Sequence, residues 1–229
     1  MQAGIVGLPN VGKSTLFNAL TNAGAAAASY PFCTVAPNTG IVRVPDRRLD
    51  TLEAHFKREQ AVPAVLEVLD IAGLVQGASR GEGLGNQFLA SIREVDAIMH
   101  VVRCFADPDV AHVPGDIDPV RDIETIETEL MLADLASAER SLEKAQSQAK
   151  RQDKAAAARA DLLERCVARL SEGLPVRGIG GNDPGVRKQL FELGLLTAKD
   201  VLYVANVNED DIHGESATAQ AVRNSAASR

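Results

Sequence analysis

A phosphate-binding loop near the start of the chain limits the folds that this sequence can adopt. Residues 7–14, Gly-Leu-Pro-Asn-Val-Gly-Lys-Ser, match the pattern G-x-x-x-x-G-K-[ST], between a short apolar run and a helical pattern over residues 15–20. Such a loop joins a strand end to a helix N-terminus, because the first N–H groups of the helix bind phosphate. The sequence therefore predicts a P-loop fold of the α/β class.

Short apolar runs rich in β-branched residues alternate with helical patterns along the chain. The five runs are residues 3–6, 40–44, 64–69, 97–104 and 201–207. This alternation is typical of a mostly parallel sheet covered by helices on both faces. We therefore expect the sheet of a P-loop NTPase.

Residues 122–174 interrupt this alternation, because good helix formers continue almost without a break. Within this stretch, two series of apolar residues recur every three or four positions, which indicates an antiparallel coiled-coil hairpin. The Gly- and Pro-rich return over 173–185 argues against a single long helix. We expect its tip over residues 146–154. The apolar seam positions are Leu135, Ala138, Leu142, Ala145 and Ala149, then Ala156, Ala160, Leu163, Val167, Leu170 and Leu174.

These patterns predict three segments along the chain. Residues 1–118 form the first part of the nucleotide-binding core, residues 119–198 form an inserted helical domain, and residues 199–229 return to the core.

The P-loop predicts a role for six consecutive residues, which are Asn10, Val11, Gly12, Lys13, Ser14 and Thr15. We expect backbone N–H groups of residues 10–14 to surround the β-phosphate. The Lys13 ammonium is expected to bind β- and γ-phosphate oxygens, and the Ser14 hydroxyl to bind Mg²⁺. Thr15 opens the helix that follows.

Two further motifs predict contacts to the metal and to the γ-phosphate. A buried-strand pattern ends in Asp70-Ile71-Ala72-Gly73, a D-x-x-G arrangement. It places the Asp70 carboxylate near Mg²⁺ and the Gly73 N–H near the γ-phosphate. Between the P-loop and this motif, Thr34 stands in a loop punctuated by prolines and is expected to add a second hydroxyl ligand to Mg²⁺.

Three motifs together resemble the Obg branch of the P-loop GTPases and, within it, the Obg-like ATPase (YchF) subfamily. They read NVGKSTLFNAL, YPFCTVAPNTG and DIAGLVQGASRGEGLGNQF, in this order. The resemblance covers nearly the whole chain, including the helical insertion before the last core strand. It implies a link to ribosomes and, in the family, a C-terminal TGS domain, which we expect to be absent from this chain. We accordingly expect residues 199–229 to lack an edge strand and part of the adenine pocket.

The residues after the last expected strand bear on the choice of base. Where ordinary GTPases have N-K-x-D, this sequence has Asn206-Val207-Asn208-Glu209. Glu209 is one methylene longer than the Asp that reads guanine, so the paired acceptor contacts are displaced. An Asn206 amide matches the ring nitrogen and the exocyclic amine of adenine. The resemblance, in which N-x-x-E accompanies ATP, also favours ATP, and a GTPase with poor base selectivity is the alternative.

The position that usually orients the attacking water holds Leu74, whose apolar side chain cannot do so. One substitute is His112, because a neutral imidazole can polarise water near physiological pH. Another is Asn10, acting through a bound K⁺ beside the phosphates. Gln76 and Glu82 are further candidates.

From these residues we expect slow, Mg²⁺-dependent hydrolysis of ATP to ADP and phosphate, with His112 and Asn10 as the catalytic candidates. Two alternatives stay open on the same motifs. One is a nucleotide-dependent binding switch with negligible hydrolysis, and the other is an orthodox GTPase.

Charge and cysteine content limit the partners and the compartment. The chain has 24 Lys and Arg against 31 Asp and Glu, a net charge of −7, which argues against a dedicated DNA-binding protein. Three separated cysteines and no apolar run of membrane-spanning length indicate a cytoplasmic protein without membrane contact, and we expect a monomer.

Basic residues gather at the expected hairpin tip, where Asp153 is the one acidic residue between positions 144 and 159. An ordinary solvated helix face would have the same composition, and the ribosome link of the resembled subfamily favours contact with ribosomal RNA. The five basic residues are Lys144, Lys150, Arg151, Lys154 and Arg159.

Overall fold

The computed structural model describes residues 1–23, 38–56, 62–71, 84–110, 116–150, 153–181 and 183–229. A five-stranded sheet lies at its centre, in the order β2-β3-β1-β4-β5. The strands are β1 (Gln2–Val6), β2 (Thr39–Arg43), β3 (Val65–Asp70), β4 (Ala97–Arg103) and β5 (Asp200–Asn206). Four of these strands are parallel, and β2 runs antiparallel to β3.

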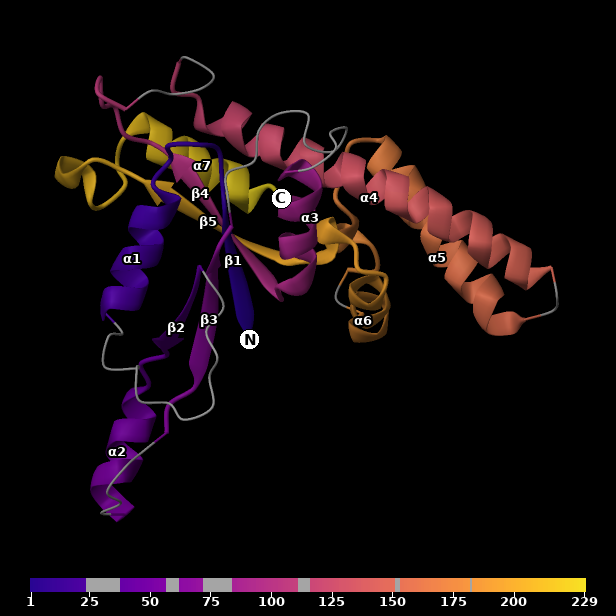
Figure 1. Cartoon of the computed structure of the whole chain (residues 1–229), viewed down its shortest axis with the longest axis horizontal. Helices are drawn as coiled ribbons and strands as arrows, with labels where there is room; N and C mark the ends of the chain where they lie inside the picture. The colour runs from indigo at the N-terminus through magenta and orange to yellow at the C-terminus, as the bar shows by residue number, and fades with distance from the viewer. Residues whose placement is uncertain (24–37, 57–61, 72–83, 111–115, 151–152, 182) are drawn as a thin grey trace.

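Helices pack on both faces of this sheet (Figure 1). On one face α1 comes so close to β2 that a Cβ on Gly40 would lie 2.0 Å from the Thr21 side chain. On the other face Ile123 of α4 and Val222 of α7 pack against Val102. The mostly parallel α/β sheet predicted from the sequence is thereby confirmed. The α-helices are α1 (Lys13–Ala23), α2 (Arg47–Phe56), α3 (Leu84–Glu94), α4 (Pro119–Ala149), α5 (Lys154–Ser171), α6 (Pro184–Glu192) and α7 (Ala217–Ala227).

The main hydrophobic core holds the strands in register and so positions the loops that follow them. Ile5, Val68 and Ile92 are fully buried in it. Because β1, β3, β4 and β5 are parallel, their carboxyl ends meet at one edge of the sheet, where α/β folds bind nucleotides.

Helices α4 and α5 form a hairpin that leaves the core side by side (Figure 1). Asp118 caps α4, its carboxylate accepting a hydrogen bond from the Arg121 N–H at 3.1 Å, and Asp153 caps α5 in the same way. The 31 residues of α4 span about 46 Å at the usual rise per residue. None of the described helices is both long and apolar enough to cross a membrane.

The hairpin seam is close to the predicted one, with two differences. Leu162 and Cys166 of α5 join the buried positions between the helices. Leu174 is exposed, because α5 ends at Ser171 and Gly173 turns the chain at φ +73°. The tip is also shorter than expected, since α4 continues to Ala149 and α5 starts at Lys154.

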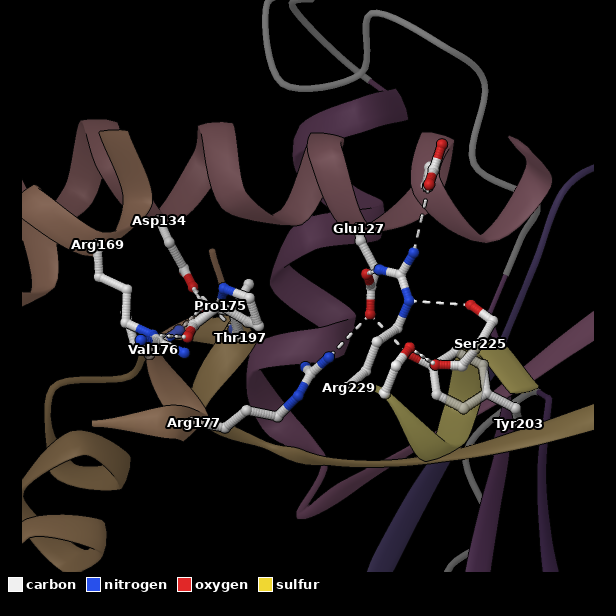
Figure 2. Close-up of polar contacts among 12 residues, drawn as sticks. Glu127, Asp134, Arg169, Pro175, Val176, Arg177, Thr197, Tyr203, Ser225 and Arg229 are labelled. Atoms are coloured by element: carbon white, nitrogen blue, oxygen red, sulfur yellow. Dashed lines mark hydrogen bonds and ion pairs between the residues drawn. The ribbon is translucent and has the colours of Figure 1, made fainter. Parts of the chain in front are cut away.

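Two buried carboxylates on α4 attach the base of this hairpin to the core (Figure 2). Asp134 accepts hydrogen bonds from the Leu196 and Thr197 N–H groups at 2.8 and 2.7 Å and from the Thr197 hydroxyl at 2.7 Å. Glu127 accepts from Arg177 at 2.8 Å, from the Tyr203 hydroxyl at 2.5 Å and from Arg229. Burial raises the pKa of the Asp134 carboxyl, and its three hydrogen bonds oppose that shift.

Candidate nucleotide-binding site

The loop between β1 and α1 has a backbone conformation that few residues allow. Gly12 has φ +96°, and a Cβ there would lie 2.3 Å from Nδ2 of Asn206. Both the conformation and the space therefore require glycine. Asn10 has φ 63°, in the left-handed region that Asn tolerates better than most residues. The loop ends on the N-terminus of α1, whose first N–H groups have no partner within the helix.

The Lys13 side chain is held across this loop. It is buried, and its ammonium donates a hydrogen bond of 2.8 Å to the Leu8 carbonyl. Burial lowers the pKa of Lys13, while the Asp70 carboxylate partly opposes the shift. A phosphate oxygen would place negative charge beside this cation and offset the hydration that burial has removed.

The two metal ligands expected among the described residues lie in contact. Ser14 is the second residue of α1 and Asp70 ends β3, and the Ser14 hydroxyl donates a hydrogen bond of 2.7 Å to the Asp70 carboxylate. A hydroxyl and a carboxylate are oxygen ligands of the kind that Mg²⁺ prefers, with water and phosphate oxygens completing its shell. Among the described residues no three His, Cys, Asp or Glu side chains cluster as a metal site.

The end of β5 reaches the P-loop. Nδ2 of Asn206 donates a hydrogen bond of 2.9 Å to the Val11 carbonyl, 195 residues away in the sequence. The Asn206 carbonyl also accepts from the Cys104 N–H at 2.8 Å, which joins the ends of β5 and β4. Val207 is partly buried, whereas Glu209 is exposed in the short turn that follows.

The structure brings together Asn10, Val11, Gly12, Lys13, Ser14 and Asp70, with Asn206 beside them. Thr15 is exposed and is the third residue of α1. Thr34, Gly73 and His112 lie outside the described residues, as do Leu74, Gln76 and Glu82.

The sequence patterns did not identify Arg103 as a residue of this region. It ends β4, is fully buried, and donates hydrogen bonds to three backbone carbonyls of the segment that follows. A charged residue at the end of an otherwise apolar strand was the available signal, and by itself it does not distinguish a buried arginine from a solvated one.

Residues 2–128 match the family model described as the 50S ribosome-binding GTPase. The match covers more than half of the chain and contains both the P-loop and the Asp70 motif. The chain belongs to this family. The geometry is consistent with this family, because Lys13, Ser14 and Asp70 lie together at the carboxyl edge of the sheet.

Curated relatives and a solved structure confirm the resemblance to YchF proteins. The chain is 54% identical over 209 residues to the ribosome-binding ATPase YchF of Haemophilus influenzae, covering 91% of this chain and 57% of the relative. Identity to the Bacillus subtilis protein of the same name is 50% over 212 residues, covering 93% and 58%. The structure of the Schizosaccharomyces pombe YchF GTPase matches with a TM-score of 0.77 at 42% identity, covering 92% of this chain and 57% of that one.

The chain thus spans a little over half the length of the relatives that it matches. The names of these relatives give different nucleotides: the bacterial proteins are called ATPases, and the yeast protein is called a GTPase.

Proposed function

We propose that this chain binds ATP with Mg²⁺ at the carboxyl edge of the sheet and hydrolyses it slowly to ADP and phosphate. The observation that carries the proposal is the contact between Ser14 and Asp70, two residues that separate motifs assign to one metal ion. The membership of the 50S ribosome-binding GTPase family and the ATPase names of the bacterial relatives support it.

Different residues of the site are proposed to bind the phosphates and the metal ion. Lys13 exchanges its bond to the Leu8 carbonyl for β- and γ-phosphate oxygens, and N–H groups of residues 10–14, in the P-loop and at the start of α1, bind the β-phosphate. Ser14 and Asp70, with Thr34 from outside the described residues, hold Mg²⁺. Held there, Mg²⁺ would supply positive charge beside the phosphate oxygens. Gly73 donates its N–H to the γ-phosphate in this scheme.

Asn206 is the proposed reader of adenine. One amide hydrogen is used on the Val11 carbonyl, and a primary amide keeps a second hydrogen and a carbonyl oxygen with which to match adenine. Val207 contacts the nucleoside where ordinary GTPases have Lys, and Glu209 replaces the Asp that selects guanine. The proposal therefore favours ATP over GTP.

His112 is the residue proposed to polarise the attacking water. Asn10 with a bound K⁺ is the alternative source of catalytic charge. Leu74 at the usual position is the reason to expect slow turnover. The same residue favours one second candidate function, a nucleotide-dependent switch in which hydrolysis is incidental. Release of phosphate measured with and without ribosomes separates the two, because a switch would show negligible turnover in both.

The proposed partner is the ribosome, contacted through the basic hairpin tip. Lys144, Lys150, Lys154 and Arg159 are exposed there, and Figure 1 shows the hairpin reaching away from the sheet. The ribosome-binding names of the relatives support this partner, and phosphate groups of ribosomal RNA match the charge of the tip. Such a partner places the protein in the cytoplasm.

The deciding experiment is displacement of a fluorescent ATP analogue by unlabelled ATP and GTP, in wild type and in Asn206→Ala. ATP is expected to displace the analogue at about tenfold lower concentration than GTP, and Asn206→Ala should remove most of that difference. Tripolyphosphate serves as a competitor without a base. Its affinity should fall less than that of ATP, although the loss of the Val11 contact will weaken both. Equal displacement by ATP and GTP in wild type would contradict the proposed base.

A further inference from the structure

Strand β5 forms one edge of the sheet, and its outer side pairs with no other strand among the residues that the structure describes. Its sequence, DVLYVAN, has five consecutive apolar residues and contains no Lys, Arg or Pro. Such a continuous apolar run is typical of a strand inside a sheet, because exposed edges are usually protected by charges or proline. The opposite edge strand, β2, follows that rule, since it ends in exposed Arg43, two residues before Pro45. The composition of β5 therefore indicates that another strand covers it.

The pairing with β4 determines which backbone groups of β5 face outward. The Asn206 carbonyl accepts a hydrogen bond of 2.8 Å from the Cys104 N–H, so residue 206 directs its backbone polar groups toward β4. The backbone N–H and C=O groups of successive residues in a strand point to alternate edges. Those of Val201, Tyr203 and Ala205 therefore point away from β4. The outer edge of β5 thus offers three donors and three acceptors to a further strand.

Apolar side chains are exposed on both faces of the sheet at this edge. Leu202 is 60% exposed, although it lies in the middle of the strand. On the other face, a groove of about 320 Å³ lies between β5 and α7, and Ala205, Val207 and Val222 line it. Ile212, which also lines the groove, is 78% exposed. A strand added to β5 would cover Leu202 on one face and place side chains beside the groove on the other.

The outer edge of β5 is complementary to itself. Its outward-facing residues are symmetric about Tyr203, so antiparallel pairing of two copies places Tyr203 opposite Tyr203 and Val201 opposite Ala205 of the second copy. Each of these three opposite pairs can exchange two hydrogen bonds, about six in all. The charged residue of the strand, Asp200, then lies opposite the neutral Asn206 of the second copy. The pairing therefore uses every outward backbone group of the strand and brings no like charges together.

We propose that two copies of this chain associate through antiparallel pairing of their β5 strands, forming one continuous sheet across a two-fold axis. Such pairing uses the β5 edge of both copies and therefore stops at a dimer. The carboxyl ends of the two β5 strands point in opposite directions, so the two proposed nucleotide sites lie at opposite ends of the shared sheet. The interface is small, and we expect a dissociation constant of about 10–100 µM. This dimer replaces the monomer expected from the sequence, and it does not depend on the proposed nucleotide or its hydrolysis.

Sedimentation velocity without nucleotide, over protein concentrations from about 2 to about 300 µM, tests the dimer. The wild-type mass should rise from the chain mass of 24.3 kDa toward twice that value. Leu202→Lys places an ammonium on the strand edge, opposite Val204 of the second copy, and should raise the dissociation constant at least about tenfold. Leu52→Lys is the matched control, because Leu52 of α2 is 53% exposed and the change in charge is the same. It should dimerise as wild type does.

Disulfide trapping tests the register of the pairing. Residues 202 and 204 of the two copies lie directly opposite in the proposed dimer, as a pair whose Cα atoms are about 4.5 Å apart, within the range that a disulfide spans. A mixture of Leu202→Cys and Val204→Cys should therefore form a covalent dimer on mild oxidation. Either variant alone should give little more than wild type, which carries the same native cysteines and so measures the background.

Four outcomes would overturn the proposal. The first is a wild-type chain that stays monomeric at every concentration, which would leave a strand of a different protein as the occupant of the edge. The second is a dimer that Leu202→Lys does not weaken. The third is growth beyond two copies, which two-fold pairing does not allow. The fourth is trapping that is as strong in either single variant as in the mixture.

Discussion

The Ser14 hydroxyl donates a hydrogen bond of 2.7 Å to the Asp70 carboxylate, joining the first turn of α1 to the last residue of β3. The two residues are 56 positions apart, and each belongs to a different motif. Their contact places a hydroxyl and a carboxylate beside the buried ammonium of Lys13, and the pKa of that ammonium already responds to Asp70. Changes at either residue should therefore act on the metal and the phosphates together.

Ser14→Ala is expected to weaken binding of Mg-ATP by about tenfold or more, because it removes one proposed metal ligand and leaves Asp70 without its hydroxyl partner. Titration calorimetry with Mg-ATP measures the effect. Ser171→Ala is the matched control, since the Ser171 hydroxyl donates to the Val167 carbonyl in the hairpin. Wild-type affinity in Ser14→Ala would refute the assignment of the P-loop.

Gly12→Ala should abolish nucleotide binding, while Gly173→Ala should leave it intact. Both glycines have positive φ, at +96° and +73°, so both substitutions strain the backbone by about 1 kcal/mol or more. Only at Gly12 would the new Cβ also meet Asn206, whereas nothing lies within 4 Å at Gly173. Urea unfolding of both variants measures the cost of backbone strain, and ATP binding measures the effect of the clash with Asn206. An equal loss of ATP affinity in the two variants would contradict the close approach of Asn206 to the loop.

The stability of the protein should fall as the pH is lowered through the histidine range, because of His100. Burial lowers the pKa of this imidazole from 6.5 to about 3, with Arg229 and Lys13 contributing. Below about pH 6.5 the His100 imidazole is protonated in the unfolded chain but stays neutral in the folded chain. The free energy of unfolding therefore decreases by about 1.4 kcal/mol per pH unit from this group, until pH reaches about 3.

Urea unfolding at about pH 7.5 and about pH 5 checks this expectation, because ordinary carboxylates stay largely ionised in that window. His100→Phe should lose about 2 kcal/mol less between the two pH values than wild type does. His213→Gln is the control, since His213 is exposed. Identical pH dependence in wild type and His100→Phe would show that the imidazole titrates normally.

Charge reversal at the hairpin tip should weaken the proposed binding to ribosomes and leave the proposed hydrolysis of ATP unaltered. The double variant Lys150→Glu, Lys154→Glu changes two exposed residues at the end of the hairpin. Co-sedimentation with ribosomes is expected to drop at least about tenfold, and binding by wild type should weaken steeply with added salt. Lys188→Glu on α6 is the control, because Lys188 is exposed outside the tip. Undiminished co-sedimentation of the double variant would exclude the tip as the contact.

Local patterns in the sequence were sufficient for much of the architecture. The five predicted strands appear within one residue of their expected ends, and the helical insertion forms a hairpin. These features depend on side-chain periodicity and on turn residues such as Gly12 and Gly173, which act over a few neighbouring positions. Leu174 was placed wrongly in the seam, because periodicity continues past the turn at Gly173 that ends the helix.

The tertiary structure alone decided which distant residues meet. Strand order and register bring Asn206 to Val11 and Ser14 to Asp70, and no local pattern encodes either distance. Burial likewise decided that the guanidinium of Arg103 turns inward to the carbonyls of its own loop. A strand-end arginine has many solvated alternatives, and only the packed sheet edge removes them. The sequence by itself therefore determined the elements and the P-loop chemistry, and the folded chain determined the contacts that join them into a site.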